Sequence, residues 1–200
     1  MLANRAKLRQ CLPTEPLWLK QVHGIAAVNA DFAANLLEAD AAYAHQPGKV
    51  CAVMTADCLP VLFCDRAGTA VAATHAGWRG LAAGVLESTI KRMDVPPNTV
   101  LAWLGPAIGP NCFEVGDEVR ATFMAHDPTA ISAFARKSPE KWLADIYMLA
   151  RQRLQAVGIQ SISGGNFCTV SDRERFFSYR RDGVTGRMAS LIWLTGNSGV

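Results

Sequence analysis

Three side chains of the kinds that bind metal ions stand at points where apolar runs of the sequence end. His23 precedes a glycine, Cys58 precedes Leu-Pro, and His75 precedes Ala-Gly. Turns at strand ends are places where a rigid scaffold displays functional groups. Zinc accepts two neutral imidazoles and one thiolate, and three protein ligands leave its fourth position open to water or substrate. The residue types therefore indicate a catalytic zinc site.

The spacing of these residues leaves a simpler interpretation open. His23 and Cys58 are 35 residues apart and Cys58 and His75 are 17 apart, and these spacings match no local zinc finger. Judged by spacing alone, hydrogen-bonding histidines at strand ends and a small buried cysteine are the stronger explanation.

Composition indicates one compact domain spanning residues 1–200. Half of the residues are hydrophobic, 18% are charged, and the net charge is +3 without a basic stripe, which argues against a nucleic-acid partner. No apolar run is long enough for a membrane span, and the first residues lack a secretory pattern. Six cysteines in a chain of this length are expected to be reduced thiols in the cytoplasm. We expect a monomer or homodimer that binds small molecules.

The apolar periodicity predicts a mixed series of strands and helices. Strands are expected at 17–23, 49–55, 60–64, 69–75, 100–104, 159–162 and 188–194. Helices are expected at 2–11, between Gly77 and Pro96, at 114–125 and at 142–157. Because strands and helices do not alternate strictly, the order favours an α+β fold over a doubly wound sheet.

Several motifs resemble those of the YfiH/PgeF family, historically labelled laccase-domain or polyphenol oxidase. In chain order the segments are Gln-Val-His-Gly, Met-Thr-Ala-Asp-Cys-Leu-Pro-Val-Leu-Phe, His-Ala-Gly-Trp-Arg-Gly and Leu-Gly-Pro-Ala-Ile-Gly-Pro. Residues 176–187 also resemble the closing motif, so the resemblance extends from about residue 15 to residue 194. It implies zinc ligation by His23, Cys58 and His75, and mixed sheets packed between helices in a four-layer α/β/β/α sandwich.

One departure from the family pattern concerns the start of the chain. Family members usually open with a further segment that carries an Arg-x-Gly-Gly stretch and an Asn-Leu pair. This sequence begins downstream of such a segment, so we expect substrate binding to be affected more than metal binding.

The resemblance implies a zinc-dependent purine nucleoside phosphorylase. The implied substrates are adenosine, inosine, guanosine and methylthioadenosine, with adenosine deamination as a second activity. Guanidinium groups bind oxyanions bidentately, so the candidate phosphate partners are Arg79, Arg180, Arg181 and Arg187, each of which has a solvated surface arginine as its alternative. Phe177 is a candidate for stacking on a purine.

Two carboxylates near the motifs are candidates for acid–base chemistry. Asp57, beside the thiolate, is expected to act as a general base, to orient a ligand imidazole, or simply to cap a turn. Glu114 is expected to do either catalytic job or to be a helix N-terminal acid.

Three other functions use the same residues differently. Cys58 and His75 would serve as nucleophile and base in a thiol amidase that acts on peptidoglycan precursors such as UDP-MurNAc-L-Ser. A binder of metal or nucleotide without catalysis is a further alternative. A copper polyphenol oxidase is disfavoured because the chain has only four histidines and lacks a His-x-His pair, so copper ranks below zinc as the ion.

Overall fold

The computed structural model describes residues 2–33 and 36–196, and its centre is a six-stranded mixed sheet. The strands lie in the order β1 (Ala27–Asn29), β2 (Ala41–Ala44), β5 (Val71–Ala76), β4 (Leu59–Asp65), β6 (Val100–Leu104) and β10 (Ser161–Gly164). The central pairs are antiparallel, and the two outermost pairs, β1–β2 and β6–β10, are parallel.

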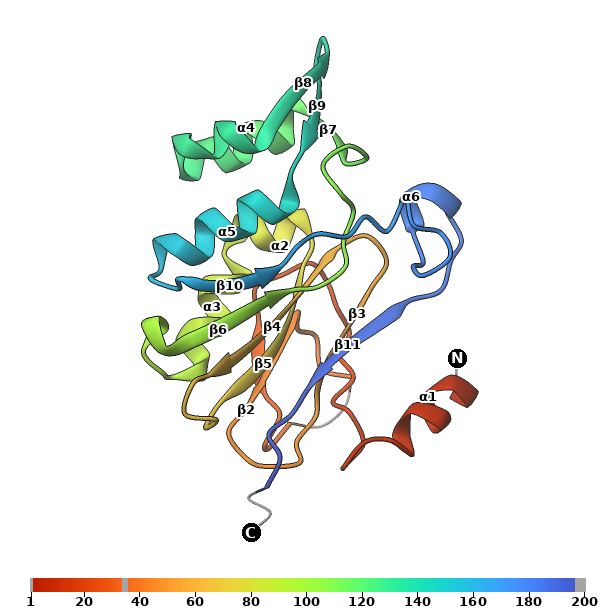
Figure 1. Cartoon of the computed structure of the whole chain (residues 1–200), viewed down its shortest axis with the longest axis vertical. Helices are drawn as coiled ribbons and strands as arrows, with labels where there is room; N and C mark the ends of the chain where they lie inside the picture. The colour runs from red at the N-terminus through yellow and green to blue at the C-terminus, as the bar shows by residue number, and fades with distance from the viewer. Residues whose placement is uncertain (1, 34–35, 197–200) are drawn as a thin grey trace.

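Two smaller sheets complete the β-structure. One pairs β3 (Cys51–Thr55) with β11 (Met188–Ile192) in antiparallel fashion. The other joins β7 (Glu114–Gly116), β9 (Lys141–Ala144) and β8 (Phe134–Ser138), and together with α4 (Asp117–His126) it lies at the end of the molecule far from both termini (Figure 1).

The helices cover the sheets on two sides. On one face of the six-stranded sheet lie α2 (Trp78–Ala83), α3 (Val85–Met93) and α5 (Ile146–Ala156), and on its other face lies the β3–β11 pair. Beyond β3 lies α1 (Leu2–Arg9). Its Arg5 stacks over the ring of Trp18 and donates a hydrogen bond to the sulfur of Met54. The short α6 (Tyr179–Asp182) and 3₁₀ turns at Pro97–Thr99 and Pro128–Ala133 complete the fold. The predicted α+β fold with four layers is confirmed, and α1 is the outer helix on the β3 side in the part of the chain described.

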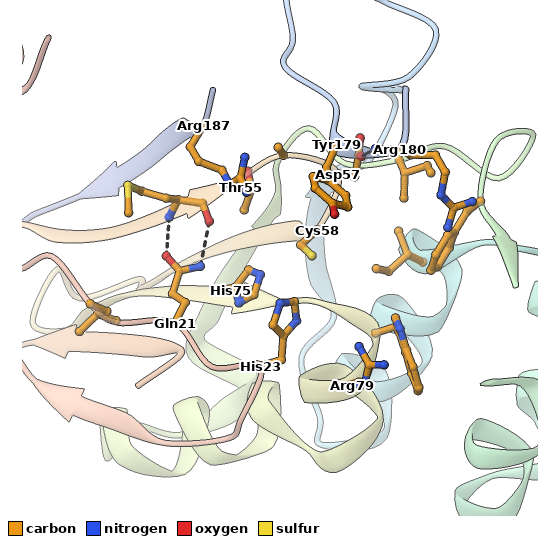
Figure 2. Close-up of a pocket in the computed structure, with 17 residues that line it drawn as sticks. Gln21, His23, Thr55, Asp57, Cys58, His75, Arg79, Tyr179, Arg180 and Arg187 are labelled. Carbon is orange, nitrogen blue, oxygen red and sulfur yellow. Dashed lines mark hydrogen bonds between the residues drawn. The ribbon is translucent and has the colours of Figure 1, made fainter. Parts of the chain in front are cut away.

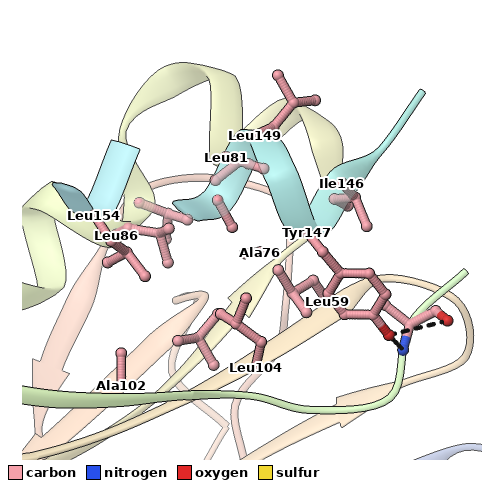
Figure 3. Packing of buried hydrophobic residues seen from close by; sticks show 14 of the residues in the cluster. Leu59, Ala76, Leu81, Leu86, Ala102, Leu104, Ile146, Tyr147, Leu149 and Leu154 are labelled. Atoms are coloured by element: carbon pink, nitrogen blue, oxygen red, sulfur yellow. Dashed lines mark hydrogen bonds between the residues drawn. The ribbon is translucent and has the colours of Figure 1, made fainter. Parts of the chain in front are cut away.

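The alternation of side chains along the central strands builds a core on each face of the large sheet. Val71 and Ala73 of β5 face β3, whereas Ala72 and Ala76 face the helices. Figure 3 shows the helix side, where Leu59 and Leu104 of the sheet pack beneath leucines of α2, α3 and α5. Since both faces are buried, the strands are apolar throughout, as the sequence predicts.

Several predicted elements are wrong in type or extent. Residues 17–23 form an extended segment with single bridges, Leu17 to Cys51 and Lys20 to Glu38, in place of a strand. The helix predicted between Gly77 and Pro96 is divided by Gly84, whose φ of 100° ends α2 before α3 begins.

The predicted helices at 114–125 and 142–157 both begin with strands. Their first residues pair with each other as β7 and β9, so α4 begins at Asp117 and α5 at Ile146. Asp145 caps α5 by accepting hydrogen bonds from the amides of Tyr147 and Met148, which fixes the boundary. None of the helices in the described ranges has the length and hydropathy needed to cross a bilayer.

Candidate metal centre

The structure brings His23, Cys58 and His75 together from three separate segments. One nitrogen of each imidazole and the sulfur of Cys58 all lie within 4.8 Å of one another. His23 lies in the turn that precedes β1, Cys58 in the turn between β3 and β4, and His75 near the end of β5. The two imidazole rings meet edge to face with centroids 4.8 Å apart (Figure 2).

A buried carboxylate, Asp40, orients both histidines. Its Oδ1 lies 2.7 Å from Nδ1 of His75. The same carboxylate accepts hydrogen bonds from the backbone amides of Val22, His23 and Gly24, at 3.2, 3.0 and 2.6 Å. Because Asp40 is fully buried, these groups are the partners that compensate its desolvation. One side chain therefore fixes the His23 turn and the orientation of the His75 ring.

The protonation states follow from these contacts. Burial alone would lower the pKa of His75, but hydrogen bonds to Asp40 and Cys58 outweigh it and raise the pKa to about 9. Burial and the positive charge of His75 lower the pKa of His23, which favours its neutral form. The pKa of Asp40 is lowered, because the hydrogen bonds it accepts from His75 and Gly24 outweigh its burial.

The donor set fits a tetrahedral metal ion with one open position. Nδ1 of His75 is occupied by Asp40, so Nε2 is the nitrogen that faces the cluster, and such carboxylate–histidine pairs are typical of zinc ligands. Ligand atoms of tetrahedral zinc lie about 3.5 Å apart, so separations of up to 4.8 Å would have to shorten by no more than about 1.3 Å. Solvent exposure increases across the cluster: His75 is buried, Cys58 is half-buried and His23 is exposed. Solvent therefore reaches it from one side.

Backbone geometry explains two further residues of the motifs. Gln21 exchanges two 2.8 Å hydrogen bonds with the backbone of Met54, which ties the His23 turn to β3. His23 has a φ of 59°, in the left-handed region that side chains seldom adopt. Gly77 is required because a Cβ there would lie 2.6 Å from Nδ1 of His23 and 3.1 Å from the sulfur of Cys58.

Replacing Gly77 with alanine should therefore weaken metal binding without unfolding the protein. The backbone at Gly77, with φ of −63° and ψ of 155°, tolerates any residue, so the effect comes from the clash with His23. We expect the dissociation constant for zinc to rise at least about tenfold, measured by competition with a chromogenic chelator. Gly196→Ala is the matched control, because its Cβ would make only an ordinary 3.9 Å contact. Equal zinc affinities in the two variants would contradict the assignment of His23.

The candidate metal ligands lie in a cavity of about 740 Å³. Figure 2 shows the residues around it. Its lining comes from β3, β5, α2, α5, α6 and nearby loops: Leu19, Gln21, His23, Met54, Thr55, Ala56, Asp57, Cys58, His75, Trp78, Arg79, Ile108, Phe113, Ile146, Tyr179, Arg180 and Arg187. A cavity of this size accommodates a nucleoside-sized ligand.

Three of the four predicted arginines line this cavity. Arg79 stacks on Trp78 at 4.6 Å. Arg180 donates to the backbone oxygen of Glu114 at 3.1 Å, and Arg187 donates to the backbone oxygen of Gly186 at 2.9 Å. Their guanidinium groups place positive charge around the cluster.

The remaining predicted binding residues lie elsewhere. Arg181 holds its own loop together by donating to the backbone oxygens of Thr169 and Phe176. Arg181 and Phe177 line a separate cavity of about 350 Å³. The carboxylate of Glu114 pairs with Lys137 at 2.6 Å, so its side chain is committed to a surface ion pair.

Asp57 contacts a different part of the structure from the one expected. Its carboxylate accepts hydrogen bonds from the hydroxyls of Thr169 and Ser178, at 2.5 and 3.1 Å, and from the amide of Arg180 at 2.7 Å. The residue has a φ of 85° and its side chain is buried. The carboxylate that orients the imidazole of the candidate ligand His75 is Asp40, and Asp57 instead joins the Cys58 turn to the segment that carries Arg180.

Two residues of the site were missed in the sequence. Asp40 stands in an alanine-rich stretch without a recognisable motif, and its acidic side chain between apolar residues was the only available signal. Tyr179 lines the cavity with 61% of its surface exposed. It lies within the motif at residues 176–187, in which the sequence predicts binding roles for its neighbours Phe177, Arg180, Arg181 and Arg187.

Comparison with known proteins agrees with the motifs. The chain is 60% identical over 186 residues to purine nucleoside phosphorylase YfiH of Escherichia coli, covering 92% of this chain and 75% of that protein. It is 57% identical over 192 residues to purine nucleoside phosphorylase PA4543 of Pseudomonas aeruginosa, covering 96% and 79%. The crystal structure of protein NMB0706 of Neisseria meningitidis superposes with a TM-score of 0.93 at 54% identity, covering 96% and 80%. The family model described as multi-copper polyphenol oxidoreductase laccase matches residues 1–195, and the chain belongs to this family, which includes the YfiH proteins.

Proposed function

We propose that this protein is a zinc-dependent purine nucleoside phosphorylase. The proposed substrates are adenosine, inosine, guanosine and methylthioadenosine, and adenosine deamination is a second proposed activity. The observation that carries the proposal is the convergence of His23, Cys58 and His75 in a nucleoside-sized cavity lined by arginines. The names of the relatives from Escherichia coli and Pseudomonas aeruginosa support the same reaction class.

The residues of the cavity divide the work of phosphorolysis. Arg79, Arg180 and Arg187 attract phosphate, because guanidinium pairs with oxyanions in a fixed bidentate geometry. When bound, zinc supplies a Lewis-acid position beside the cluster that holds an anionic oxygen. The aromatic ring of Tyr179 offers a surface on which a purine can stack. Apolar side chains of the wall, such as Ile108, limit the access of water that would compete with phosphate.

A panel of nucleosides, supplied with and without phosphate, tests the proposed reaction. We expect one zinc per chain in the purified protein, and ribose 1-phosphate and free base formed only when phosphate is present. A chelator should abolish turnover and zinc should restore it. Bound zinc and nucleoside without any product would instead identify a binder without catalysis. Full activity with copper alone on phenols would support the oxidase alternative.

Arg187→Ala should raise the KM for phosphate more than the KM for the nucleoside. Removing one guanidinium from the cavity is expected to raise the KM for phosphate about 10–100-fold, since a hydrogen bond to a charged group contributes about 1.5–3 kcal/mol. Steady-state kinetics with phosphate and inosine varied separately will measure the change. Arg136→Ala on the exposed part of β8 is the control. Matching KM values for phosphate in both variants would exclude Arg187 from phosphate binding.

A second candidate function is favoured by the contacts around Cys58. The Cys58 sulfur lies within 4.8 Å of a ring nitrogen of His75, and Asp40 holds the other side of that ring at 2.7 Å. A cysteine next to a histidine whose other ring nitrogen contacts an aspartate resembles the catalytic triad of a thiol hydrolase. The corresponding proposal is an amidase acting on peptidoglycan precursors such as UDP-MurNAc-L-Ser.

The two candidates respond in opposite ways to two reagents. A thiol amidase keeps its activity in a chelator and loses it to iodoacetamide. The phosphorylase loses its activity to the chelator, and bound zinc protects Cys58 from alkylation. We propose a cytoplasmic location and a small-molecule substrate for either activity.

A further inference from the structure

A pair of cysteines lies outside the residues that line the cavity. Cys112 belongs to the turn between β6 and β7, and Cys168 belongs to the segment between β10 and α6, 56 residues later in the chain. Ser171 lies between them, with its Oγ 3.5 Å from the sulfur of Cys112 and 3.3 Å from that of Cys168. The two thiols therefore share one hydroxyl group.

The backbone keeps the two segments close together. The amide of Thr169 donates to the oxygen of Ala107 at 3.0 Å, and the amide of Gly109 donates to the sulfur of Cys168 at 3.3 Å. A Cβ at Gly109 would lie 2.8 Å from the Cβ of Cys168, so only glycine permits this approach. The proximity of the thiols is thus built into the fold.

The surroundings of Cys168 favour its thiolate. Burial alone would raise the pKa of this thiol, but hydrogen bonds from Ser171, Gly109 and Cys112 outweigh burial and lower it. By contrast, burial raises the pKa of Cys51 and Cys64. Both Cys112 and Cys168 are only partly buried, so a small oxidant can reach them.

We propose that Cys112 and Cys168 form a reversible disulfide, with Cys168 as the attacking thiolate and Cys112 as the resolving thiol. The oxidant is a low-molecular-weight disulfide such as glutathione disulfide. Cys168 attacks one of its sulfurs, forming a mixed disulfide and releasing one glutathione thiolate. Cys112 then gives its proton to the released glutathione thiolate and attacks the sulfur of Cys168, which displaces the second glutathione as a thiolate that takes a proton from water. The two protein thiols lose two electrons, and the oxidant is reduced to two molecules of glutathione.

This disulfide would connect two walls of the cavity. The turn that carries Cys112 also supplies Phe113 to the lining, and the segment that follows Cys168 supplies Tyr179 and Arg180. Reduced, these segments are joined by hydrogen bonds such as that of Thr169 to Ala107; oxidised, they would be joined covalently as well. The state of the dithiol therefore sets how freely the two walls can separate.

Peptide mapping of the zinc-loaded protein after exposure to glutathione disulfide tests the proposal. We expect a linked pair of peptides containing Cys112 and Cys168, lighter by two hydrogens than the separate peptides and separated again by dithiothreitol. Exposed Cys11 provides an internal measure of nonspecific reaction. Cys112→Ser should instead accumulate glutathione on Cys168. After glutathione disulfide has fully modified Cys11, iodoacetamide is added to label any thiol that is still free. If it labels both Cys112 and Cys168, the proposal is wrong.

Ser171→Ala provides a second test that leaves both thiols in place. Without the hydroxyl, the first reaction of Cys168 with glutathione disulfide should slow about threefold, because the thiolate fraction falls more than the nucleophilicity rises. Ser132→Ala, in the 3₁₀ turn remote from the pair, should leave the rate unchanged. Equal rates in both variants would contradict the role of the shared hydroxyl in activating Cys168.

Discussion

His75→Ala should abolish both metal binding and turnover while the fold persists. His75 is the most buried of the three candidate ligands, and its ring connects the cluster to Asp40. Removing it leaves two ligands where zinc requires three, and we expect zinc to be lost at micromolar concentrations and activity to fall below detection. Metal analysis after gel filtration, together with circular dichroism, will show whether the loss occurs in folded protein.

The control for this variant is a histidine outside the cluster. His126 lies at the end of α4, and His126→Ala should retain one zinc per chain and full activity. A His75→Ala protein that keeps its metal and turnover would mean that the assignment of the centre is wrong.

Asp40→Asn should weaken metal binding and destabilise the protein together. Both carboxylate oxygens of Asp40 accept hydrogen bonds, and an amide would put an NH2 group in place of one of them, opposite N–H donors of His75 and His23 or of Val22 and Gly24. We expect zinc affinity to fall about 10–100-fold, as for other residues that orient metal-binding histidines. Losing a buried carboxylate with several partners should lower the free energy of unfolding by about 3 kcal/mol. Chelator competition and urea denaturation will measure the two effects.

Asp31→Asn separates the effect on stability from the effect on the metal. Asp31 is also buried and accepts hydrogen bonds from the amides of His45 and Gln46, away from the cavity. Its replacement should lower stability while leaving zinc affinity unchanged. If both variants bind zinc like the unaltered protein, Asp40 has a structural role only.

The sequence predicted those features that depend on residue type and local pattern. The apolar runs in β4, β5 and β6 indicated buried strands, because both faces of the large sheet are covered. Motif resemblance selected His23, Cys58 and His75 as a group, although spacing alone favoured a simpler explanation for each. Their proximity in the structure depends on strand pairing, which the local pattern does not encode.

The features that were missed depend on contacts between distant residues. Asp40 looks like a surface acid in the sequence, and only the pairing of β2 with β5 places it beside His75. The segment at 17–23 has the composition of a strand, but the side chain of Gln21 takes up the hydrogen-bonding groups of Met54. Asp57 was assigned by its position next to Cys58, whereas its partners lie more than 100 residues further along the chain.

The origin of the three candidate ligands has a consequence for how the protein would acquire an ion. Since His23, Cys58 and His75 meet only after β5 has joined the sheet, an unfolded chain offers an ion no comparable site. An ion held only by the native chain shifts the folding equilibrium toward that chain by mass action. The melting temperature of this protein should consequently rise with the concentration of free zinc, so its thermal stability would depend on how much zinc is available.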